Sequence, residues 1–334
     1  MKAIILVGGE GTRLRPLTLC LPKALAAVVN EPMIYYMLGW LKKHGVKEAI
    51  LVACYLPSKL KKVIGSRYSG MKIRYIYEDS PLGTGGAIKR AEKYLTGTTV
   101  VMNGDLITNI DLSKMMRFHK SNKAKATIAL TPVEDPSAFG LVETSKDGRV
   151  TGFIEKPSPE EVQGKETNIN AGVYLFEPEV LKLMQFSKVY SIERDIFPVM
   201  VGKGFYGMVF KKIYWMDCGT VEKYRKVTRD VLLGKFTPFI KVKMKNGVSI
   251  GEDSVIASGS KIAGTMVIGK NCSVSKNVLL KNCIIWDRVQ IDEGAVLQNC
   301  ILAHGCMIGK NSILNGAVLG ADICIMPGSK MKNC

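Results

Sequence analysis

The sequence has 334 residues, 47% of them hydrophobic, and its 47 Lys and Arg against 29 Asp and Glu give a formal net charge of +18. This length and apolar content suit about two globular domains and argue against a disordered chain. No apolar run reaches the 18 residues of a membrane helix, and the N-terminal run is too short for a signal peptide. We therefore expect a cytoplasmic protein with no membrane partner.

The cysteines, histidines and basic residues limit the remaining classes. Nine cysteines and three histidines form no C-x-x-C pair and no cluster, which argues against a zinc site or a disulfide framework. Residues 248–334 hold eight Lys and Arg against six Asp and Glu, so +16 of the charge lies in residues 1–247. Nucleic-acid binding is one reading of this charge. Because the basic residues form no block, a surface that attracts small phosphorylated substrates explains it equally well, and we expect no nucleic-acid partner.

The first two thirds of the chain alternate between strand-like and helix-like segments. This alternation is typical of βαβ units in a doubly wound sheet, where ligands bind beyond the carboxyl ends of the strands. Buried parallel strands are predicted at Ala3–Val7, Ala49–Ala53, Ile73–Tyr77 and Thr98–Met102, and amphipathic helices at Met33–His44, Ser58–Ile64 and Gly86–Tyr94. Later strands are predicted at Ala126–Thr131, Leu141–Thr144, Val173–Phe176 and Gly207–Lys211.

The first predicted strand runs into a glycine-rich loop, "ILVGGEGTRLRPLT" at residues 5–18. Leu14 stands where a dinucleotide fingerprint needs its third glycine, and no Gly-Lys-Ser/Thr follows as in a P-loop. Glycines still let backbone N–H groups approach an anion, and Arg13, Arg15 and Lys23 add positive charge. The loop is either an ordinary turn with solvated arginines or a cradle for a triphosphate.

Three further stretches carry groups suited to phosphate chemistry. Gly83, Gly85 and Gly86 open a helix after the third strand, where N–H groups can meet a base or a phosphate or merely cap the helix. Asp105 in "VVMNGDLIT" and Asp217 in "YWMDCGT" each follow a strand. Two such carboxylates can hold Mg²⁺ together with substrate phosphates, and either can instead cap a turn.

A six-residue repeat begins after residue 247 and predicts a parallel β-helix. Aliphatic residues recur at Ile250, Ile256, Ile262, Ile268, Val274 and Leu280, then after one slip at Ile285, Ile291 and Leu297, and again at Ile308, Leu314 and Ile325. Small residues four positions later, Cys272 and Cys306 among them, are interpreted as corner packers. At about eighteen residues per coil the segment predicts four to five coils.

These patterns predict three parts: an α/β domain at residues 1–234, a linker at 235–247 and a hexapeptide-repeat β-helix at 248–334. A short solenoid needs caps or partners at its ends, so we expect a homo-oligomer that assembles through the β-helix.

His304 lies in the repeat. It is either a turn residue of a structural solenoid or the base of an acyltransferase, and we favour the turn residue because no orienting partner is evident.

Taken in order, "GGEGTRLRPLT…PK", "GD" after a strand, "FIEKP", "NAGVYLF" and "WMDCGT" resemble the motifs of sugar-1-phosphate nucleotidylyltransferases, and the resemblance covers nearly the whole chain. It is strongest to mannose-1-phosphate guanylyltransferases. The resemblance implies a Rossmann-like doubly wound catalytic domain followed by a left-handed parallel β-helix. "GTGG" in place of "GTAG", and Ala24 in place of the proline of "PKPL", leave the nucleotide open.

The resemblance also assigns roles to individual residues. It implies nucleotide binding by Leu6, Gly8, Gly9, Gly11, Thr12, Arg13, Glu78, Gly83, Thr84 and Gly85. It implies sugar-phosphate binding by Gly140, Glu155, Lys156, Asn170 and Gly172. It implies catalytic roles for Arg15, Lys23, Asp105, Lys156 and Asp217, with Mg²⁺ held by Asp105 and Asp217.

The implied reaction joins an NTP, with GTP favoured, to a sugar 1-phosphate, most simply mannose 1-phosphate, and releases pyrophosphate. The sugar-phosphate oxygen attacks the α-phosphorus in line, so no general base is needed. Two alternatives stay open: a glucose-1-phosphate uridylyl- or thymidylyltransferase, and a non-catalytic regulatory subunit of the same fold. The five charged residues with catalytic roles are all present, which favours the enzyme.

Overall fold

The computed structural model describes residues 1–333, which divide into two units. The first unit comprises Met1–Gly9 and Met37–Met216. The second comprises residues 10–36 and 217–333. Helix α1 (Met33–Lys43) crosses the boundary between them. No helix among residues 1–333 is long and apolar enough to cross a membrane.

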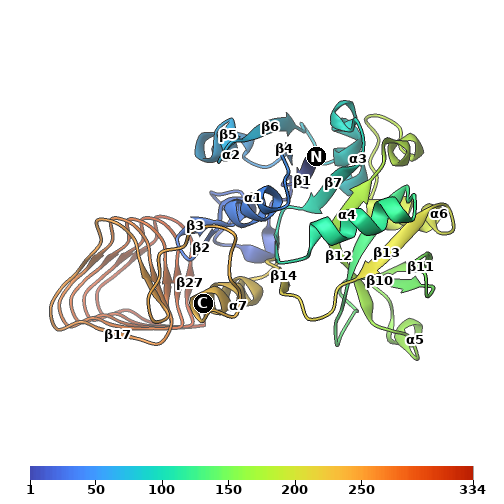
Figure 1. The fold of residues 1–334 in the computed structure, drawn as a ribbon. Helices are drawn as coiled ribbons and strands as arrows, with labels where there is room; N and C mark the ends of the chain where they lie inside the picture. The colour runs from blue at the N-terminus through green and yellow to red at the C-terminus, as the bar shows by residue number, and fades with distance from the viewer. Residues whose placement is uncertain (334) are drawn as a thin grey trace. The chain divides into compact units, whose positions relative to one another are not determined.

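The first unit is built on a ten-stranded mixed sheet with the order β11-β10-β12-β7-β1-β4-β6-β5, to which β9 adds beside β12 and β13 beside β9 (Figure 1). Strands β7, β1, β4 and β6 are parallel, as their buried apolar sequences predict. The strands are β1 (Lys2–Leu6), β4 (Glu48–Ala53), β5 (Arg67–Tyr68), β6 (Met71–Tyr77), β7 (Thr99–Asn103), β9 (Ala126–Pro132), β10 (Gly140–Thr144), β11 (Val150–Glu155), β12 (Asn168–Phe176) and β13 (Phe205–Val209).

The helices that connect these strands confirm the Rossmann-like, doubly wound organisation. They are α2 (Pro57–Ile64), α3 (Gly83–Arg90), α4 (Leu112–Ser121), α5 (Pro159–Val162) and α6 (Phe197–Met200), with 3-10 helices η3 (Glu92–Tyr94) and η4 (Pro178–Leu183) and the π-helix η5 (Ile192–Ile196). A separate pair, β8 (Leu106–Thr108) and β14 (Trp215–Asp217), forms a two-stranded sheet. Helix α3 begins three residues before its expected start.

The core of the first unit includes a cluster of aromatic side chains. Tyr174, Phe176 and Phe197 pack as a cluster of rings with centroids 5.1–6.4 Å apart, which also includes Phe153 and Phe205. These side chains are almost fully buried. Their size lets a few residues bury a large apolar area.

The second unit contains a three-sided parallel β-helix, which is drawn in orange to red in Figure 1. Residues 10–36 and helix α7 (Val221–Leu232) belong to the same unit. Each side of the β-helix is a sheet of five short strands, so the β-helix has five coils. One side holds β15 (Val248–Ile250), β18 (Met266–Ile268), β21 (Ile284–Ile285), β24 (Ile301–Leu302) and β27 (Val318–Leu319). The next holds β16 (Val255–Ile256), β19 (Ser273–Val274), β22 (Gln290–Ile291), β25 (Met307–Ile308) and β28 (Cys324–Ile325). The third holds β17 (Lys261–Ala263), β20 (Leu279–Lys281), β23 (Val296–Gln298), β26 (Ile313–Asn315) and β29 (Lys330–Lys332).

The register explains the slip in the repeat. Ile250 pairs with Ile268 eighteen residues on, but Ile268 pairs with Ile285, seventeen residues on. The repeating aliphatic residues fill the interior, as expected. Cys272 and Cys306 are buried, and their thiols donate to the carbonyls of Trp286 and Gly320, each at 3.1 Å. The structure thus confirms that these cysteines pack inside the coils.

Residues 10–36 contain two single-turn 3-10 helices, η1 (Thr12–Leu14) and η2 (Lys23–Leu25), and a small hairpin of β2 (Ala27–Val28) and β3 (Glu31–Pro32). Asn30, at the hairpin turn, donates to the hydroxyl of Ser249 at 3.1 Å and to the carbonyl of Ile268 at 2.8 Å. The hairpin is therefore fixed to the first two coils of the β-helix.

Candidate functional site

The first unit has its topological switch point between β1 and β7, because the chain continues from β1 toward β4 on one side and returns to β7 on the other. Leu6 and Asn103 are paired at the carboxyl ends of these strands. Gly104 donates to the carbonyl of Leu6 at 2.9 Å, and a Cβ there would lie 2.4 Å from that oxygen, so only glycine fits. Gly8 and Asp105 therefore emerge at the edge where such sheets bind ligands.

Glu78 lies against the start of the glycine loop. A Cβ at Gly8 would be 3.3 Å from Oε2 of Glu78, and the side chain of Glu78 is buried. Its Oε1 has no hydrogen-bond partner among the described residues. Burial raises the pKa of Glu78, while a backbone hydrogen bond from Leu82 and the charge of Arg90 act in the opposite direction. A buried, unpartnered carboxylate oxygen favours a ligand that donates hydrogen bonds.

The glycines of α3 meet a neighbouring segment closely. A Cβ at Gly83, whose φ is +72°, would lie 2.4 Å from the carbonyl oxygen of Tyr190, and one at Gly85 would lie 2.8 Å from Cβ of Tyr190. The N–H of Gly85 donates to that same carbonyl at 2.8 Å. Thr84 donates to Oε2 of Glu193 at 2.8 Å. These contacts give the glycines a packing role, and their contact with a nucleotide stays a prediction.

Asn170 and Gly172 occupy an irregular stretch of β12. The carboxamide of Asn170 accepts from the N–H of Gly172 at 2.8 Å and donates to the hydroxyl of Tyr174 at 3.0 Å. Gly172 has a φ of +69°, and a Cβ there would lie 2.9 Å from the side chain of Asn103. The indole N–H of Trp215 donates to the carbonyl of Ala171 at 2.9 Å. The stretch is thus held rigidly by its own contacts.

Gly140 and Glu155 are paired across β10 and β11, and a Cβ at Gly140 would lie 3.1 Å from Oε2 of Glu155. Burial raises the pKa of Glu155, and the charge of Glu193 raises it further, against Lys156 and Arg194. Lys156 is exposed and has a φ of +55°, a left-handed conformation that is costly for a lysine. The structure therefore gathers Gly140, Glu155 and Lys156 at one strand end.

Glu193 joins this group and was not expected from the sequence. Besides accepting from Thr84, it accepts from the hydroxyl of Ser191 at 2.9 Å. Its charge acts on Glu155 and on the buried Tyr174, whose pKa is raised well above its usual range mainly by burial. Glu193 lies in "YSIERD", which contains no motif, and only its three-dimensional neighbours reveal it.

In the second unit, the glycine loop and Lys23 lie together. Gly11 has a φ of +65° and precedes η1, and a Cβ there would lie 3.1 Å from Cβ of Lys23. The hydroxyl of Thr18 donates to the carbonyl of Gly11 at 2.8 Å. Thr12 opens the single turn of η1 directly after this glycine. The turn at Gly11 is thus held by a hydrogen bond, and the aliphatic part of the Lys23 side chain lies beside it.

The two arginines of the loop have different neighbours. Arg15 forms an ion pair with Glu10 at 2.9 Å, in which both side chains are about half exposed, at 47% and 56%. Such an exposed pair contributes little stability, so phosphate groups can replace Glu10. The guanidinium of Arg13 lies beside Gly219, because a Cβ there would be 3.2 Å from Nη2 of Arg13 and 3.1 Å from Oδ2 of Asp217.

Asp217 is neutralised by a second residue that the sequence did not indicate. Nζ of Lys223, in the first turn of α7, lies 2.5 Å from Oδ1 of Asp217. The helix is capped by Thr220, whose hydroxyl accepts from the N–H of Lys223 at 3.3 Å. The spacing of six residues between Asp217 and Lys223 is no helical repeat, because the strand end and the cap lie between them. Lys223 could therefore be found only from the structure.

The donors for a divalent cation are limited. Within residues 1–333, no group of three or more His, Cys, Asp or Glu side chains is placed to hold a metal ion. Mg²⁺ usually takes one or two carboxylates and completes its shell with water and phosphate oxygens. Asp105 and Asp217 are both carboxylates, which is the donor type that this ion takes.

His304 lies in the fourth coil of the β-helix, against Trp286, with ring centroids 4.9 Å apart. Its Nδ1 is 3.9 Å from Oδ2 of Asp287, which is too long for a hydrogen bond. Burial lowers the pKa of His304. A ring without a bonded carboxylate to orient it is poorly prepared as a base, which favours the interpretation as a turn residue.

Comparison with known proteins agrees with this fold and these motifs. Residues 2–233 match the nucleotidyl transferase family, and residues 214–331 match the LbH domain of the EIF2B epsilon subunit. The parallel β-helix is thus of the left-handed class. Mannose-1-phosphate guanylyltransferase of Mycobacterium tuberculosis is 34% identical over 89% of this chain and 83% of its own length.

Two further relatives each cover 69% of the chain. D-glycero-alpha-D-manno-heptose 1-phosphate guanylyltransferase of Aneurinibacillus thermoaerophilus is 39% identical over 69% of this chain and 98% of its own length. The crystal structure of HddC from Yersinia pseudotuberculosis complexed with GMP-PN covers 69% of this chain and 99% of that one, with a TM-score of 0.57 and 29% identity. The chain belongs to the nucleotidyl transferase family, and within it to the sugar-1-phosphate nucleotidyltransferases.

Proposed function

We propose that this chain transfers a guanylyl group from GTP to mannose 1-phosphate in a Mg²⁺-dependent reaction that yields GDP-mannose and pyrophosphate. The names of the relatives support this pairing. The observation in this chain that carries the choice of base is the buried carboxylate of Glu78, whose Oε1 lacks a hydrogen-bond partner among the described residues.

Guanine suits a carboxylate better than the other bases do. Its N1–H and its exocyclic amine are adjacent donors, and a carboxylate accepts two hydrogen bonds side by side. Uracil and thymine present one N–H between two carbonyl oxygens, which an ionised carboxylate would repel. Binding of guanine would also favour the charged form of Glu78 and offset the cost of its burial.

The phosphates would lie along the glycine loop. Gly8, Gly9, Gly11 and Thr12 would offer backbone N–H groups, and Arg13, Arg15 and Lys23 would neutralise the charge that gathers at the α-phosphorus. The sugar would lie against Gly140, Glu155, Asn170 and Gly172, with Lys156 on its phosphate. Holding both substrates for in-line attack accounts for catalysis without a general base, because the sugar phosphate is already an anion at neutral pH.

Asp105 and Asp217 would hold Mg²⁺. When bound, the ion supplies charge neutralisation of the triphosphate and of the leaving pyrophosphate. Lys223 would keep Asp217 oriented, because its ammonium group pairs with the carboxylate.

Pyrophosphate release tests the proposal. GTP, UTP, dTTP, ATP and CTP are each paired with mannose, glucose and N-acetylglucosamine 1-phosphate in the presence of Mg²⁺. We expect release with GTP and mannose 1-phosphate, and its loss in Asp105→Ala. Release with UTP or dTTP and glucose 1-phosphate would overturn the substrate assignment, and no release from folded protein would favour the regulatory subunit.

We also propose that copies of the chain assemble through the β-helix. Leu279, Val296 and Ile313 stack in register on the outside of its third sheet, and Ile313 is 44% exposed. An apolar ladder on an outer face is typical of an interface. We expect light scattering to give more than one chain for the wild type and one chain for Val296→Lys/Ile313→Lys. A monomeric wild type at micromolar concentration would contradict the assembly.

A further inference from the structure

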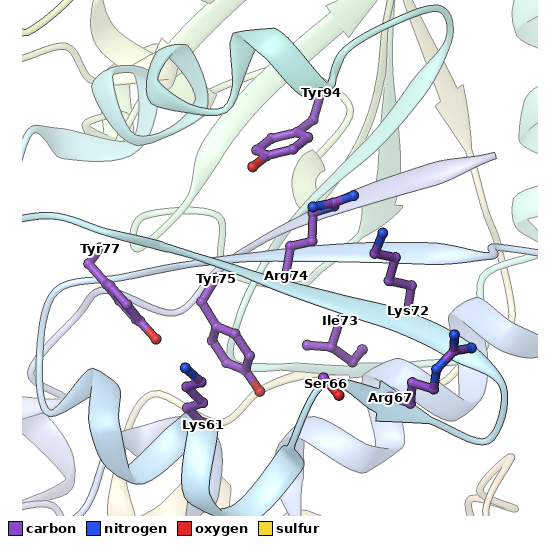
Figure 2. A pocket seen from close by; sticks show the side chains of 9 residues that line it. All are labelled: Lys61, Ser66, Arg67, Lys72, Ile73, Arg74, Tyr75, Tyr77 and Tyr94. Carbon is purple, nitrogen blue, oxygen red and sulfur yellow. The ribbon is translucent and has the colours of Figure 1, made fainter.

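The hollow of about 490 Å³ beside β6 does not form a binding site of its own. Figure 2 shows Lys72 and Arg74 on one face of β6, whereas Lys61 and Tyr75 lie on the other face. Because the strand separates these cations, they do not converge on one anion. A different charged group lies among the residues of the candidate site without a part in the proposed reaction. This group is the carboxylate of Glu193.

Glu193 lies where the start of α3 is hydrogen-bonded to η5. The hydroxyl of Thr84 accepts from the N–H of Ile192 at 2.8 Å and donates to Oε2 of Glu193 at 2.8 Å. The N–H of Tyr190 donates to the carbonyl of Leu82 at 3.0 Å in the same region. The position of Glu193 is therefore fixed relative to the glycines that are expected to bind the nucleotide.

The other end of η5 packs against the two strands that carry sugar-site residues. The ring of Phe197, which directly follows η5, lies 5.1 Å from that of Phe153 on β11 and 5.2 Å from that of Tyr174 on β12, measured between centroids. Glu155 lies two residues beyond Phe153 on β11. The hydroxyl of Tyr174 accepts from the carboxamide of Asn170 at 3.0 Å. The short helix η5 thus extends from α3 to the strands of the sugar site.

The charge of Glu193 acts on both of these strands. Burial raises the pKa of Glu155 most, and among the charged groups Glu193 raises it most. Burial also raises the pKa of Tyr174 well above its usual range, again with Glu193 as the leading charge. Two neighbouring carboxylates repel each other unless donors lie between them. Hydroxyl groups of a ligand would relieve this repulsion by donating a hydrogen bond to each carboxylate.

One oxygen of Glu193 is available to a ligand. Its hydrogen bonds from the hydroxyls of Thr84 and Ser191, at 2.8 and 2.9 Å, both reach Oε2. Within residues 1–333, Oε1 accepts no hydrogen bond and forms no ion pair. The side chain is half-buried, so a small ligand can reach it. An ionised carboxylate accepts hydrogen bonds and donates none, so Oε1 suits a ligand rich in hydroxyl donors and repels a phosphate.

We propose that Glu193 is a specificity residue of the sugar-phosphate site, where its Oε1 accepts a hydrogen bond from a ring hydroxyl of the sugar 1-phosphate. This role rests on the proposed function, because it needs a sugar 1-phosphate as substrate. Glu155 and Glu193 take separate hydroxyls of one sugar, and the bond from Thr84 to Oε2 holds the second contact in place. A sugar without the matching hydroxyl leaves Oε1 unpaired and reacts more slowly.

Glu193→Gln tests this contact selectively. The amide oxygen can keep the hydrogen bonds from Thr84 and Ser191, while the amide nitrogen replaces Oε1 and cannot accept. We expect kcat/KM for the sugar 1-phosphate to fall by about tenfold or more, because a hydrogen bond to a charged group is lost, and the Kd for GTP to stay unchanged. An unchanged thermal unfolding midpoint verifies folding. Glu179→Gln, at an exposed glutamate, should leave both constants at their wild-type values.

Monodeoxy forms of the same sugar 1-phosphate distinguish a substrate contact from structural support. We expect one of these forms to react about tenfold more slowly with the wild type. For that form alone, Glu193→Gln should cause no further loss, because both changes remove the same hydrogen bond. Equal losses for every form, or a loss accompanied by weaker GTP binding, would make Glu193 a support of α3 and overturn its role in specificity.

Failure of this role and failure of the proposed reaction give different results. Pyrophosphate release by the wild type with an unchanged kcat/KM in Glu193→Gln would overturn the role of Glu193 and leave the reaction intact. No release by the wild type with any pairing would overturn the reaction. Calorimetric titration with the sugar 1-phosphates would then decide the role of Glu193: tighter binding by the wild type than by Glu193→Gln would support it, and equal binding would overturn it.

Discussion

The phenolic oxygen of Tyr224, on α7, accepts a hydrogen bond from the indole N–H of Trp286 at 2.9 Å and donates one to the carbonyl of Ala27. Both side chains are almost completely buried. One hydroxyl thus joins three parts of the second unit: the segment that follows the glycine loop, α7, and the β-helix. The segment that contains Lys23 is therefore hydrogen-bonded, through Ala27, to the rest of the second unit.

Replacing the hydroxyl should weaken that junction. Tyr224→Phe leaves the N–H of Trp286 and the carbonyl of Ala27 buried without partners, which we expect to lower the free energy of unfolding by about 1–3 kcal/mol. Urea unfolding measures the change. Tyr77→Phe, at an exposed tyrosine, serves as the matched control and should leave the free energy unchanged. Equal stabilities for both variants would show that the hydrogen bonds contribute nothing.

Gly9 provides a direct test of the phosphate cradle. A Cβ at Gly9 would have no atom within 4 Å, so Gly9→Ala should keep its stability. We expect the KM for the nucleotide to rise about tenfold, because a methyl group would hold the phosphates away from the backbone N–H groups. Gly83→Ala should behave oppositely and lose stability, since its Cβ would meet Tyr190. An unchanged KM in Gly9→Ala would place the phosphates elsewhere.

The carboxylate of Asp217 can be tested with a nearly isosteric change. Asp217→Asn keeps the shape and removes the charge that Lys223 balances, and we expect kcat to fall by about a hundredfold with a higher Mg²⁺ requirement. Asp253→Asn is the control, because Asp253 is an exposed corner of the β-helix with a φ of +59°, a conformation that asparagine accepts. Normal Mg²⁺ dependence in Asp217→Asn would remove Asp217 from the metal site.

Glu78 predicts a pH dependence of stability with a definite sign. Burial raises its pKa above the ordinary value of 4.5, so ionisation costs the folded state free energy as pH rises from that value through the raised pKa. Glu78→Gln removes this cost. We expect a higher free energy of unfolding than in the wild type at about pH 8 and no difference at about pH 4, where the carboxyl is protonated in both states.

The same variant should bind GTP more weakly, since an amide offers one acceptor where the carboxylate offers two. Glu179→Gln, at an exposed glutamate, is the control for both measurements. Greater stability with unchanged GTP binding would mean that Glu78 does not contact the base. Lower stability at about pH 8 would mean that the carboxylate is paired in the folded chain.

Much of the fold could be predicted because it depends on periodicity. The buried runs gave the parallel strands β1, β4, β6 and β7, and the six-residue repeat gave the coils of the β-helix. The change to a seventeen-residue coil also appears in the sequence as a slip. These features are local, so each segment carries its own signal.

The parts that could not be predicted depend on contacts between distant residues. Tyr190 packs against Gly83 and Gly85 from more than a hundred positions away in the sequence. This contact requires glycine at both positions, and no sequence motif reveals it. Glu193 reaches Thr84 in the same way. Lys223 is only six residues from Asp217, but a strand end and a helix cap lie between them, so no periodic pattern predicts their contact. The grouping of residues 10–36 with the β-helix, through Asn30 and Tyr224, is likewise invisible in a linear pattern.

Because residues 10–36 belong to the same unit as the β-helix, the β-helix could not be exchanged or deleted without an effect on them. Val267, Ile284 and Ile301 occupy outward positions of one β-helix sheet and are nonetheless buried. Relatives such as HddC extend over only 69% of this chain, so a nucleotidyl transferase can exist as a shorter molecule. In this chain a deletion after α7 would uncover Tyr224 and leave Asn30 without its partners. Residues 10–36 and α7 therefore depend on the β-helix for their packing and hydrogen bonds. A shortened enzyme would need different side chains on the surfaces that the β-helix covers in this chain.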